Sequence, residues 1–128
     1  MDLSNTTITV LDSNLFQNTY CLNEVLLPLT LTTINSQAFS SCYALKEITL
    51  PATVTTIGNS IFTDCFSLER LNILATEPPA LGNATITSNA ATSFKIYVPY
   101  SSDHSILTAY KTETNWSAWA DYIEEMEE

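Results

Sequence analysis

An apolar pattern recurs along this chain with a fixed 23-residue period, and it constrains the fold more than any other feature. It is clearest in two stretches: AFSSCYALKEITLP, which ends at Pro51, and IFTDCFSLERLNIL, which begins at Ile61. A 23-residue shift aligns three copies in six apolar columns without a gap. The columns are Ile8/Leu31/Val54, Leu11/Ile34/Ile57, Phe16/Phe39/Phe62, Leu22/Leu45/Leu68, Val25/Ile48/Leu71 and Leu27/Leu50/Ile73. Units of this size cannot bury their apolar faces alone, so the pattern predicts repeats stacked against one another.

Each copy contains a stretch with the periodicity of a β-strand. In LKEITLP, the apolar Ile48 and Leu50 alternate with the polar Glu47 and Thr49, as expected when successive side chains point to opposite faces of a sheet. Pro51 cannot donate a hydrogen bond to a neighbouring strand, so we expect it to end the strand. Stacked copies therefore predict a sheet with strands about 4.8 Å apart.

The repeated motif resembles the BspA-like leucine-rich repeats of bacterial surface proteins. The resemblance rests on the aliphatic-Thr-Thr-Ile-Gly start, the column containing Cys42 and Cys65, and the Ile-x-Leu-Pro ending. It is strongest over residues 6–74, and the segments EPPALGN, FKIYVP and AYKTETNWSAWADYIEEM are similar to those that often follow such repeats. The first copy departs from the pattern, because Thr19 replaces the cysteine and Asp12 replaces the glycine.

The resemblance implies an α/β repeat fold: a right-handed leucine-rich-repeat solenoid of three 23-residue repeats with a C-terminal strand-plus-helix cap. We expect a single domain, residues 1–128, with repeats at 6–28, 29–51 and 52–74 and the cap at 75–128. The 23-residue period lies within the range of about 20–29 residues that is typical of leucine-rich repeats.

The segment after the third copy is predicted to close the stack. Pro78 and Pro79 are expected to interrupt the repeat, and FKIYVP alternates like one more strand. A short helix capped by Ser102 or Asp103 should follow, and then a second helix capped by Asn115. One face of the second helix is predicted to pack on the last repeat through Trp116, Trp119, Ile123 and Met126. We expect the acidic C-terminal end to be solvated and frayed.

The opposite end of the stack has no evident cover, because the residues before Thr6 are mostly polar. Some of the apolar side chains of the first copy are therefore expected to face outward, namely among Leu11, Phe16, Leu22 and Val25. An exposed apolar end of that size indicates an interface. Three alternatives stay open: the first copy is itself the cap, the chain is cut from a longer array, or two chains form an end-to-end homodimer through the N-terminal repeat.

Composition excludes several classes of function. The formal net charge is −10, but five of the fourteen acidic residues lie in the last eight, which leaves about −5 (−10 + 5) for the body. With only four Lys and Arg residues to neutralise phosphates, no nucleic-acid partner is expected. No apolar run is long enough to cross a bilayer, so no membrane insertion is expected. MDLSNTTITV lacks the regions of a signal peptide, so we expect any leader to be absent from this chain.

No motif predicts catalysis or a cofactor. Cys42 and Cys65 share a column and fit either a metal or redox pair or two buried thiols. Zinc needs three or four ligands, and Cys21 and His104 lie outside the column, so no metal site is predicted. Ser101, Asp103 and His104 fall within four consecutive positions, which is typical of a helix start rather than a triad assembled from distant segments. We expect a non-enzyme without cofactors.

The outward strand residues are the candidate partner-binding ladder. One column contains Glu24, Glu47 and Arg70, the next contains Leu26, Thr49 and Asn72, and Lys95 and Tyr97 extend them on the closing strand. The alternative is an ordinary solvated strand surface. Four strands about 4.8 Å apart make a ladder roughly 15–20 Å wide. Its area is on the order of a few hundred Å², well below the ~800 Å² per partner of a standard interface. We therefore expect weak binding unless many copies act together.

The resemblance implies a non-catalytic protein-binding or adhesion module of a bacterial cell-surface or secreted protein. Its implied partner is a host or bacterial surface protein. Two alternatives stay open: a structural spacer that supports a neighbouring functional domain, and an intracellular scaffold. Fold alone does not decide among them.

Overall fold

The computed structural model describes residues 1–83, 86, 91 and 93–128. The rest of the chain falls within the predicted cap, residues 75–128, so that part of the prediction lies outside the described residues. The elements, in chain order, are β1 (Val10–Leu11), β2 (Thr33–Ile34), β3 (Glu47–Leu50), β4 (Thr56–Ile57), β5 (Arg70–Ile73), β6 (Ala80–Leu81), β7 (Lys95–Val98), α1 (Ser105–Thr112), the 3₁₀ helix η1 (Ser117–Tyr122) and β8 (Ile123–Glu125).

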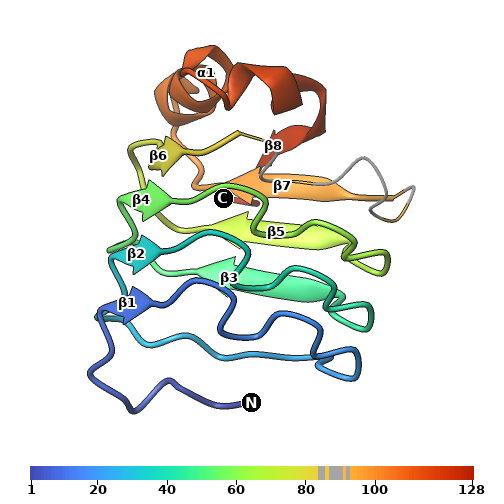
Figure 1. The fold of residues 1–128 in the computed structure, drawn as a ribbon. Helices are drawn as coiled ribbons and strands as arrows, with labels where there is room; N and C mark the ends of the chain where they lie inside the picture. Colours follow the sequence, from blue (N-terminus) through green and yellow to red (C-terminus); the bar gives the residue numbers. More distant parts are fainter. Residues whose placement is uncertain (84–85, 87–90, 92) are drawn as a thin grey trace.

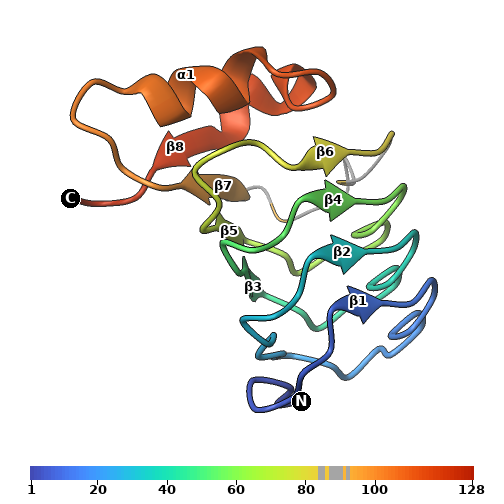
Figure 2. The same cartoon turned by 90° about the vertical axis from the view of Figure 1, so that its left-hand side faces the viewer.

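The strands form two parallel sheets that face each other (Figures 1 and 2). The first sheet has the order β1-β2-β4-β6 and the second has the order β3-β5-β7-β8. From β2 to β7 the chain alternates between them, so each winding of the chain adds one strand to each sheet. In Figure 2 the first sheet lies on the right and the second on the left, with the windings stacked from the N-terminus upward.

The pairing register follows the period found in the sequence. Thr33 pairs with Thr56 and Glu47 pairs with Arg70, and each pair reproduces the 23-residue shift (56 − 33 and 70 − 47). The next winding is slightly longer, because Thr56 pairs with Ala80 at a 24-residue shift (80 − 56). The 23-residue register thus changes at Pro78 and Pro79, where an interruption of the repeat was predicted, while the first sheet continues past them to β6. The amide of Ala80, just beyond them, makes the hydrogen bond to the Thr55 carbonyl at 2.9 Å.

The core lies between the two sheets and contains the predicted apolar columns, of which only Ile8 is partly exposed. At its centre the rings of Phe16, Phe39 and Phe62 form a nearly parallel stack. Their centroids lie 5.3 Å and 5.9 Å apart. Stacked identical side chains at equivalent positions explain why the phenylalanine column keeps its 23-residue spacing through three copies.

The N-terminal end is covered, contrary to the expectation. Leu11, Phe16, Leu22 and Val25 are all buried, with 9% exposure or less. The cover is the start of the chain, where Met1–Leu3 runs parallel to the segment around Leu26. The Leu26 amide donates to the Met1 carbonyl at 2.9 Å, and the Leu3 amide donates to the Leu26 carbonyl at 2.8 Å. Leu3, which interrupts the polar residues there, packs against the core.

The first C-terminal helix, α1, begins one or two residues later than predicted. Its N-cap position is His104, whose side chain makes no capping hydrogen bond. The predicted residue Asp103 still contributes, because its Oδ1 accepts the Ser105 amide at 3.0 Å. Ser101 also supports the first turn, since its Oγ accepts the Ile106 amide at 3.2 Å.

The second predicted helix is wrong beyond its first turns. Only Ser117–Tyr122 is helical, and Ile123–Glu125 forms β8, which pairs parallel with β7 through Ile96 and Ile123. Strand pairing wins because the edge of β7 is available, and the Met126 amide extends the ladder by donating to the Val98 carbonyl at 2.8 Å. The acidic end is therefore paired as far as Glu125, not frayed as predicted.

Two buried aromatic residues fasten the C-terminal segment to the preceding winding. Trp116 Nε1 donates to the Pro79 carbonyl at 2.7 Å, and the Tyr110 hydroxyl donates to the Ala75 carbonyl at 2.7 Å. The two rings meet edge to face with centroids 5.2 Å apart. These contacts bury two large side chains and satisfy their polar atoms at the same time, which favours a fixed position for the segment.

Candidate functional site

The second sheet places most of the predicted ladder residues in two straight columns. The register of β3, β5 and β7 aligns Glu47 with Arg70 and Lys95. The same register aligns Thr49 with Asn72 and Tyr97 in the adjacent column. These side chains leave the sheet on the face opposite the core because their neighbours Ile48, Leu71 and Ile96 point inward and are buried.

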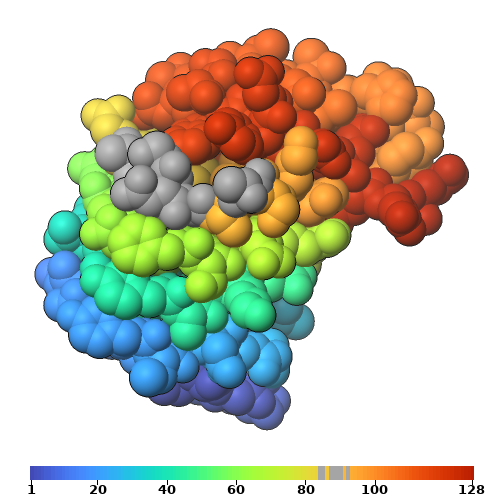
Figure 3. Space-filling view, turned by 90° about the vertical axis from the view of Figure 1, so that its right-hand side faces the viewer, coloured from blue at the N-terminus to red at the C-terminus, as the bar shows by residue number. Residues whose placement is uncertain are grey.

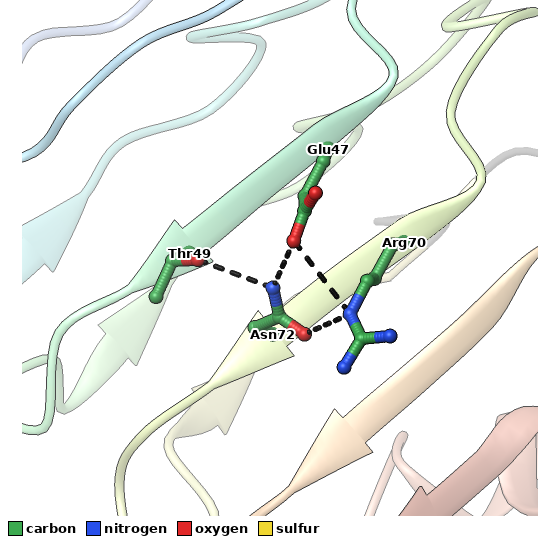
Figure 4. A network of polar contacts seen from close by, with 4 residues as sticks. All are labelled: Glu47, Thr49, Arg70 and Asn72. Carbon is green, nitrogen blue, oxygen red and sulfur yellow. Dashed lines mark hydrogen bonds and ion pairs between the residues drawn. The ribbon is translucent and has the colours of Figure 1, made fainter. Parts of the chain in front are cut away.

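A hydrogen-bond network centred on Asn72 ties the two columns together (Figure 4). Asn72 Nδ2 donates to Glu47 Oε1 at 2.8 Å and to Thr49 Oγ1 at 3.2 Å, while Arg70 Nε donates to Asn72 Oδ1 at 2.8 Å. Arg70 also forms an ion pair with Glu47 at 3.6 Å. Because Asn72 is only 8% exposed, it orients its charged neighbours and offers little surface of its own.

The remaining charges of the columns are also paired within the sheet. The Arg70 guanidinium lies 3.8 Å from the centroid of the Tyr97 ring, a cation–π contact. Lys95 Nζ lies 2.9 Å from Glu124 Oε1 on β8, and this hydrogen bond raises the pKa of the lysine. Glu47, Arg70, Lys95 and Glu124 together carry two charges of each sign, so this part of the face is electrically balanced.

Glu24 and Leu26 are not joined to these columns. Between residues 23–27 and 46–50, all of which the structure describes, there is no backbone hydrogen bond, and Leu26 bridges to Asp2 on the other edge of its segment. A groove of about 790 Å³ lies there. Its walls include the predicted residues Glu24, Leu26, Glu47 and Thr49. The sheet face therefore divides into a charge-balanced part over β5 and β7 and a hollow part beside β3.

The groove also contains apolar residues that the sequence did not single out. Leu29 and Leu74 line it and are 75% and 38% exposed. At the other end of the sheet, the C-terminal residues project beyond the face, as the red tail in Figure 3 shows. The face is therefore bounded on one side by an open groove and on the other by the overhanging end of the chain.

A second exposed ladder lies outside both sheets and was missed by the sequence analysis. The rings of Tyr20, Tyr43 and Phe66 stack with centroids 4.7 Å and 5.0 Å apart. Each is between 40% and 51% exposed. The signal was present, since the three aromatics align at the same 23-residue shift as the core columns. An outward position that keeps its chemistry through three repeats is a candidate contact surface.

The two cysteines of the shared column are buried, unpaired thiols. Cys42 Sγ donates to the Phe16 carbonyl at 3.3 Å, and Cys65 Sγ donates to the Phe39 carbonyl at 3.2 Å. Burial raises the pKa of Cys42 to about 11 and that of Cys65 to about 12. Among the described residues no three His, Cys, Asp or Glu side chains gather as metal ligands would. The geometry favours thiols that join neighbouring windings.

The stability of the protein is expected to fall as the pH rises above about 9. Unfolded thiols ionise near pH 9.0, whereas Cys42 and Cys65 stay protonated to about 11 and about 12, so the unfolded state then binds fewer protons than the folded state. Each thiol should cost up to about 1.4 kcal/mol per pH unit in that window. Urea unfolding at a series of pH values measures the slope. A Cys42→Ala/Cys65→Ala variant should flatten it and a Cys21→Ala control should not; equal slopes in all three would contradict the assignment.

Ser101, Asp103 and His104 take part in the start of α1 and its surroundings. Ser101 and Asp103 accept backbone amides of the first turn. His104 Nδ1 instead lies 2.7 Å from Glu125 Oε2 on β8. Ser101 and Asp103 thus stabilise the first turn of α1, and His104 connects the start of α1 to β8.

The stacked windings and their outward columns are the features of a repeat family, and comparison with known families agrees. Residues 4–100 match the family model described as "BspA type Leucine rich repeat region (6 copies)". The chain belongs to the BspA-type leucine-rich-repeat family. A comparison with curated proteins finds no match. The match includes β6 and β7, so the BspA-type region continues beyond residue 74, where the sequence analysis ended its last copy.

Membership in the BspA-type family is consistent with a protein-binding repeat module, and such repeats are generally non-catalytic. In the part of the chain that the structure describes, no helix has the length and apolar character needed to cross a membrane.

Proposed function

We propose that this BspA-type chain is a non-catalytic binding module of a bacterial cell-surface or secreted protein, and that its second sheet contacts a host or bacterial surface protein. The observation that carries the proposal is the exposed face of β3, β5 and β7, with aligned outward columns beside an open groove, in a chain of this family. Repeat folds commonly use such continuous surfaces for recognition.

The size of the face supports weak recognition that is strengthened by copy number. The columns span only a few strands about 4.8 Å apart, and a standard interface needs ~800 Å² per partner. Charge pairs that already satisfy one another, such as Arg70 with Glu47 and Lys95 with Glu124, gain little from a new partner unless it replaces them. Many copies on one surface would raise the effective affinity without new contacts.

The finer architecture is part of the same proposal: one domain, residues 1–128, forming a right-handed solenoid of three 23-residue repeats at 6–28, 29–51 and 52–74, with a C-terminal cap at 75–128. The strand pairings of Thr33 with Thr56 and of Glu47 with Arg70 support the repeat length. Right-handedness is supported by the general rule for crossovers between parallel strands. The buried Trp116 and Tyr110 contacts support a capping role for the last segment.

A charge swap on the ladder tests the proposed function. The variant with Glu47→Lys and Arg70→Glu keeps an ion pair but reverses its direction, so binding to a matrix protein or glycan that uses this face should weaken at least about tenfold. Thr56→Lys on β4 is the matched control, because it adds a charge to the first sheet. The measurement is binding to a panel of immobilised host matrix proteins and glycans, compared among the three chains.

If binding survives the charge swap, the face of β3, β5 and β7 is not part of the binding site. Absence of binding to every panel member would favour the spacer, for which the internal pairing of Glu47, Arg70, Lys95 and Glu124 is the favouring observation. An end-to-end homodimer through the first repeat is a separate proposal for a partner. The exposed Met1 and Leu15 at that end support it, and a monomer in light scattering at high concentration would rule it out.

A further inference from the structure

β3 has one edge whose backbone groups make no hydrogen bonds to a neighbouring strand. On the other edge, the Lys46 carbonyl accepts the Glu69 and Arg70 amides at 2.8 Å and 3.2 Å, and the Leu50 carbonyl accepts the Leu74 amide at 3.0 Å. Alternate residues of a strand direct their N–H and C=O groups to opposite edges. The backbone groups of Glu47 and Thr49 therefore point away from β5, toward residues 23–27.

The segment that the repeat predicts as the partner of that edge makes no backbone hydrogen bond to it. The 23-residue period would pair the Asn23 carbonyl with the amides of Lys46 and Glu47. On its other edge this segment is paired, since Leu26 bonds to Met1 and Leu3 and the Glu24 carbonyl accepts the Met1 amino group at 3.1 Å. By the same alternation, the backbone groups of Val25 and Leu27 point toward β3, where residues 23–27 and 46–50 share no backbone hydrogen bond.

The opening is local to the second sheet. On the opposite side of the same windings, the Phe16 amide donates to the Ala38 carbonyl at 2.8 Å, and the Asn18 amide donates to the Ser40 carbonyl at 2.9 Å. β1 and β2 are also paired in full. Backbone bonds therefore hold the first and second windings together at these contacts and in the first sheet. The two windings are separated along the groove.

We propose that this groove accepts an extended segment of a partner protein, which enters the second sheet as an additional strand between residues 24–27 and β3. Strand addition to an exposed edge is a common mode of peptide recognition, in which main-chain hydrogen bonds supply affinity and alternate side chains supply specificity. Here both walls offer unmade backbone bonds, so an inserted strand is bonded on two sides. The groove volume of about 790 Å³ lies within the range of about 300–1,000 Å³ that is usual for binding pockets.

Charges on the walls specify the outward residues of the incoming strand. One outward position lies between Glu24 and Glu47, and the only other charged side chain that lines the groove is Lys46, so the lining carries a net charge of −1 (−2 + 1). Glu24 makes no side-chain ion pair within the described residues, whereas Glu47 shares Arg70. Opposite charges at neighbouring positions across a sheet attract each other. An Arg or Lys therefore fits this position.

The other positions of the incoming strand follow from their neighbours. The next outward residue lies between Leu26 and Thr49, which favours a β-branched side chain. The residue between the two outward ones faces the core beside Val25 and Ile48, which are buried, and so must be small and apolar. The partner segment is thus a basic residue, a small apolar residue and a β-branched residue in succession, such as Arg-Ala-Val, within an extended and Pro-free stretch.

Thr49 allows a test that separates the groove from the rest of the sheet. Thr49→Pro removes the N–H that points into the groove, and proline is tolerated at a strand edge where no ladder bond is lost. Thr49→Val is the matched control, since it also loses the hydroxyl bonded to Asn72 but keeps the N–H. The probe is a fluorescein-labelled peptide, Ser-Arg-Ala-Val-Thr with glycine ends, measured by fluorescence polarisation with each chain.

The expected result is binding to the wild type and to Thr49→Val, and binding weaker by at least about tenfold with Thr49→Pro. Replacing Arg by Glu in the peptide should weaken binding to a similar extent. Absence of peptide binding to the wild type up to about 1 mM, or equal affinity for all three chains, would overturn the proposal. Strand addition rests on the proposed protein-binding role, but the two proposals can fail separately. If a panel protein binds Thr49→Pro normally and does not bind the Glu47/Arg70 charge swap, the proposed function stands and strand addition is ruled out.

Discussion

Replacing Phe39 with alanine is expected to lower the free energy of unfolding by about 3–5 kcal/mol, the usual cost of removing a fully buried aromatic ring. Phe39 is completely buried and lies between the rings of Phe16 and Phe62. Its removal leaves a cavity at the join of two windings, which stay tied by backbone bonds such as Phe39 N–H to the Ile61 carbonyl. Urea unfolding followed by circular dichroism measures the loss.

Phe16→Ala is the matched control for this prediction. Phe16 occupies the same column but stacks on one ring only and is 8% exposed. Its removal should cost less, because Phe16 has a ring of the column on one side only and the site can relax toward solvent. A loss below about 1 kcal/mol for Phe39→Ala, or a larger loss for Phe16→Ala, would contradict the column as the centre of the core.

Replacing Trp116 with alanine is expected to cost about 3–5 kcal/mol as well, for a different reason. The indole is completely buried against Tyr110, and its Nε1 satisfies the Pro79 carbonyl at 2.7 Å. The substitution removes packing and leaves that buried carbonyl without its donor, which adds a desolvation cost. Thermal unfolding monitored by near-ultraviolet circular dichroism reports both the loss of stability and the release of the aromatic cluster.

Two further variants separate the contributions at this position. Trp116→Phe keeps an aromatic ring but removes the donor, so it should be less destabilising than alanine. Trp119→Ala removes a partly buried ring that packs on Tyr122, and it should cost clearly less than Trp116→Ala. If Trp119→Ala proved the more damaging change, the attachment of the C-terminal segment would have to depend on η1 and not on Trp116.

The sequence predicts the second sheet and the apolar columns of the core, because both follow from the repeated spacing of residues along the chain. The Phe16, Phe39 and Phe62 column and the alternation around Ile48 depend only on local periodicity and on the stacking of equivalent windings. The same shift places Glu47 beside Arg70 without any knowledge of the structure. The family assignment follows from the same residues, and the match over residues 4–100 confirms it.

Features that depend on competition between distant segments could not be predicted in this way. The spacing of Ile123 from Trp116 fits one face of a helix, but Ile123 lies in a strand that pairs with the free edge of β7. Leu26 fits the ladder by its period and pairs with the start of the chain, but the opposite edge of its segment makes no backbone bond to β3, which leaves the groove open. In both cases local pattern was correct about burial or exposure, but it did not specify which backbone edges pair with each other.

Residue-by-residue amide hydrogen exchange is the sharpest test of whether the second sheet offers an open edge to a partner. We predict slow exchange for Ile48 and Leu50, whose N–H groups point at β5 in the paired register. We predict exchange faster by at least about tenfold for Glu47 and Thr49, whose N–H groups point into the groove. Equal protection of all four amides would show that residues 23–27 close the sheet in solution, and would contradict both the groove and the strand that we propose to fill it.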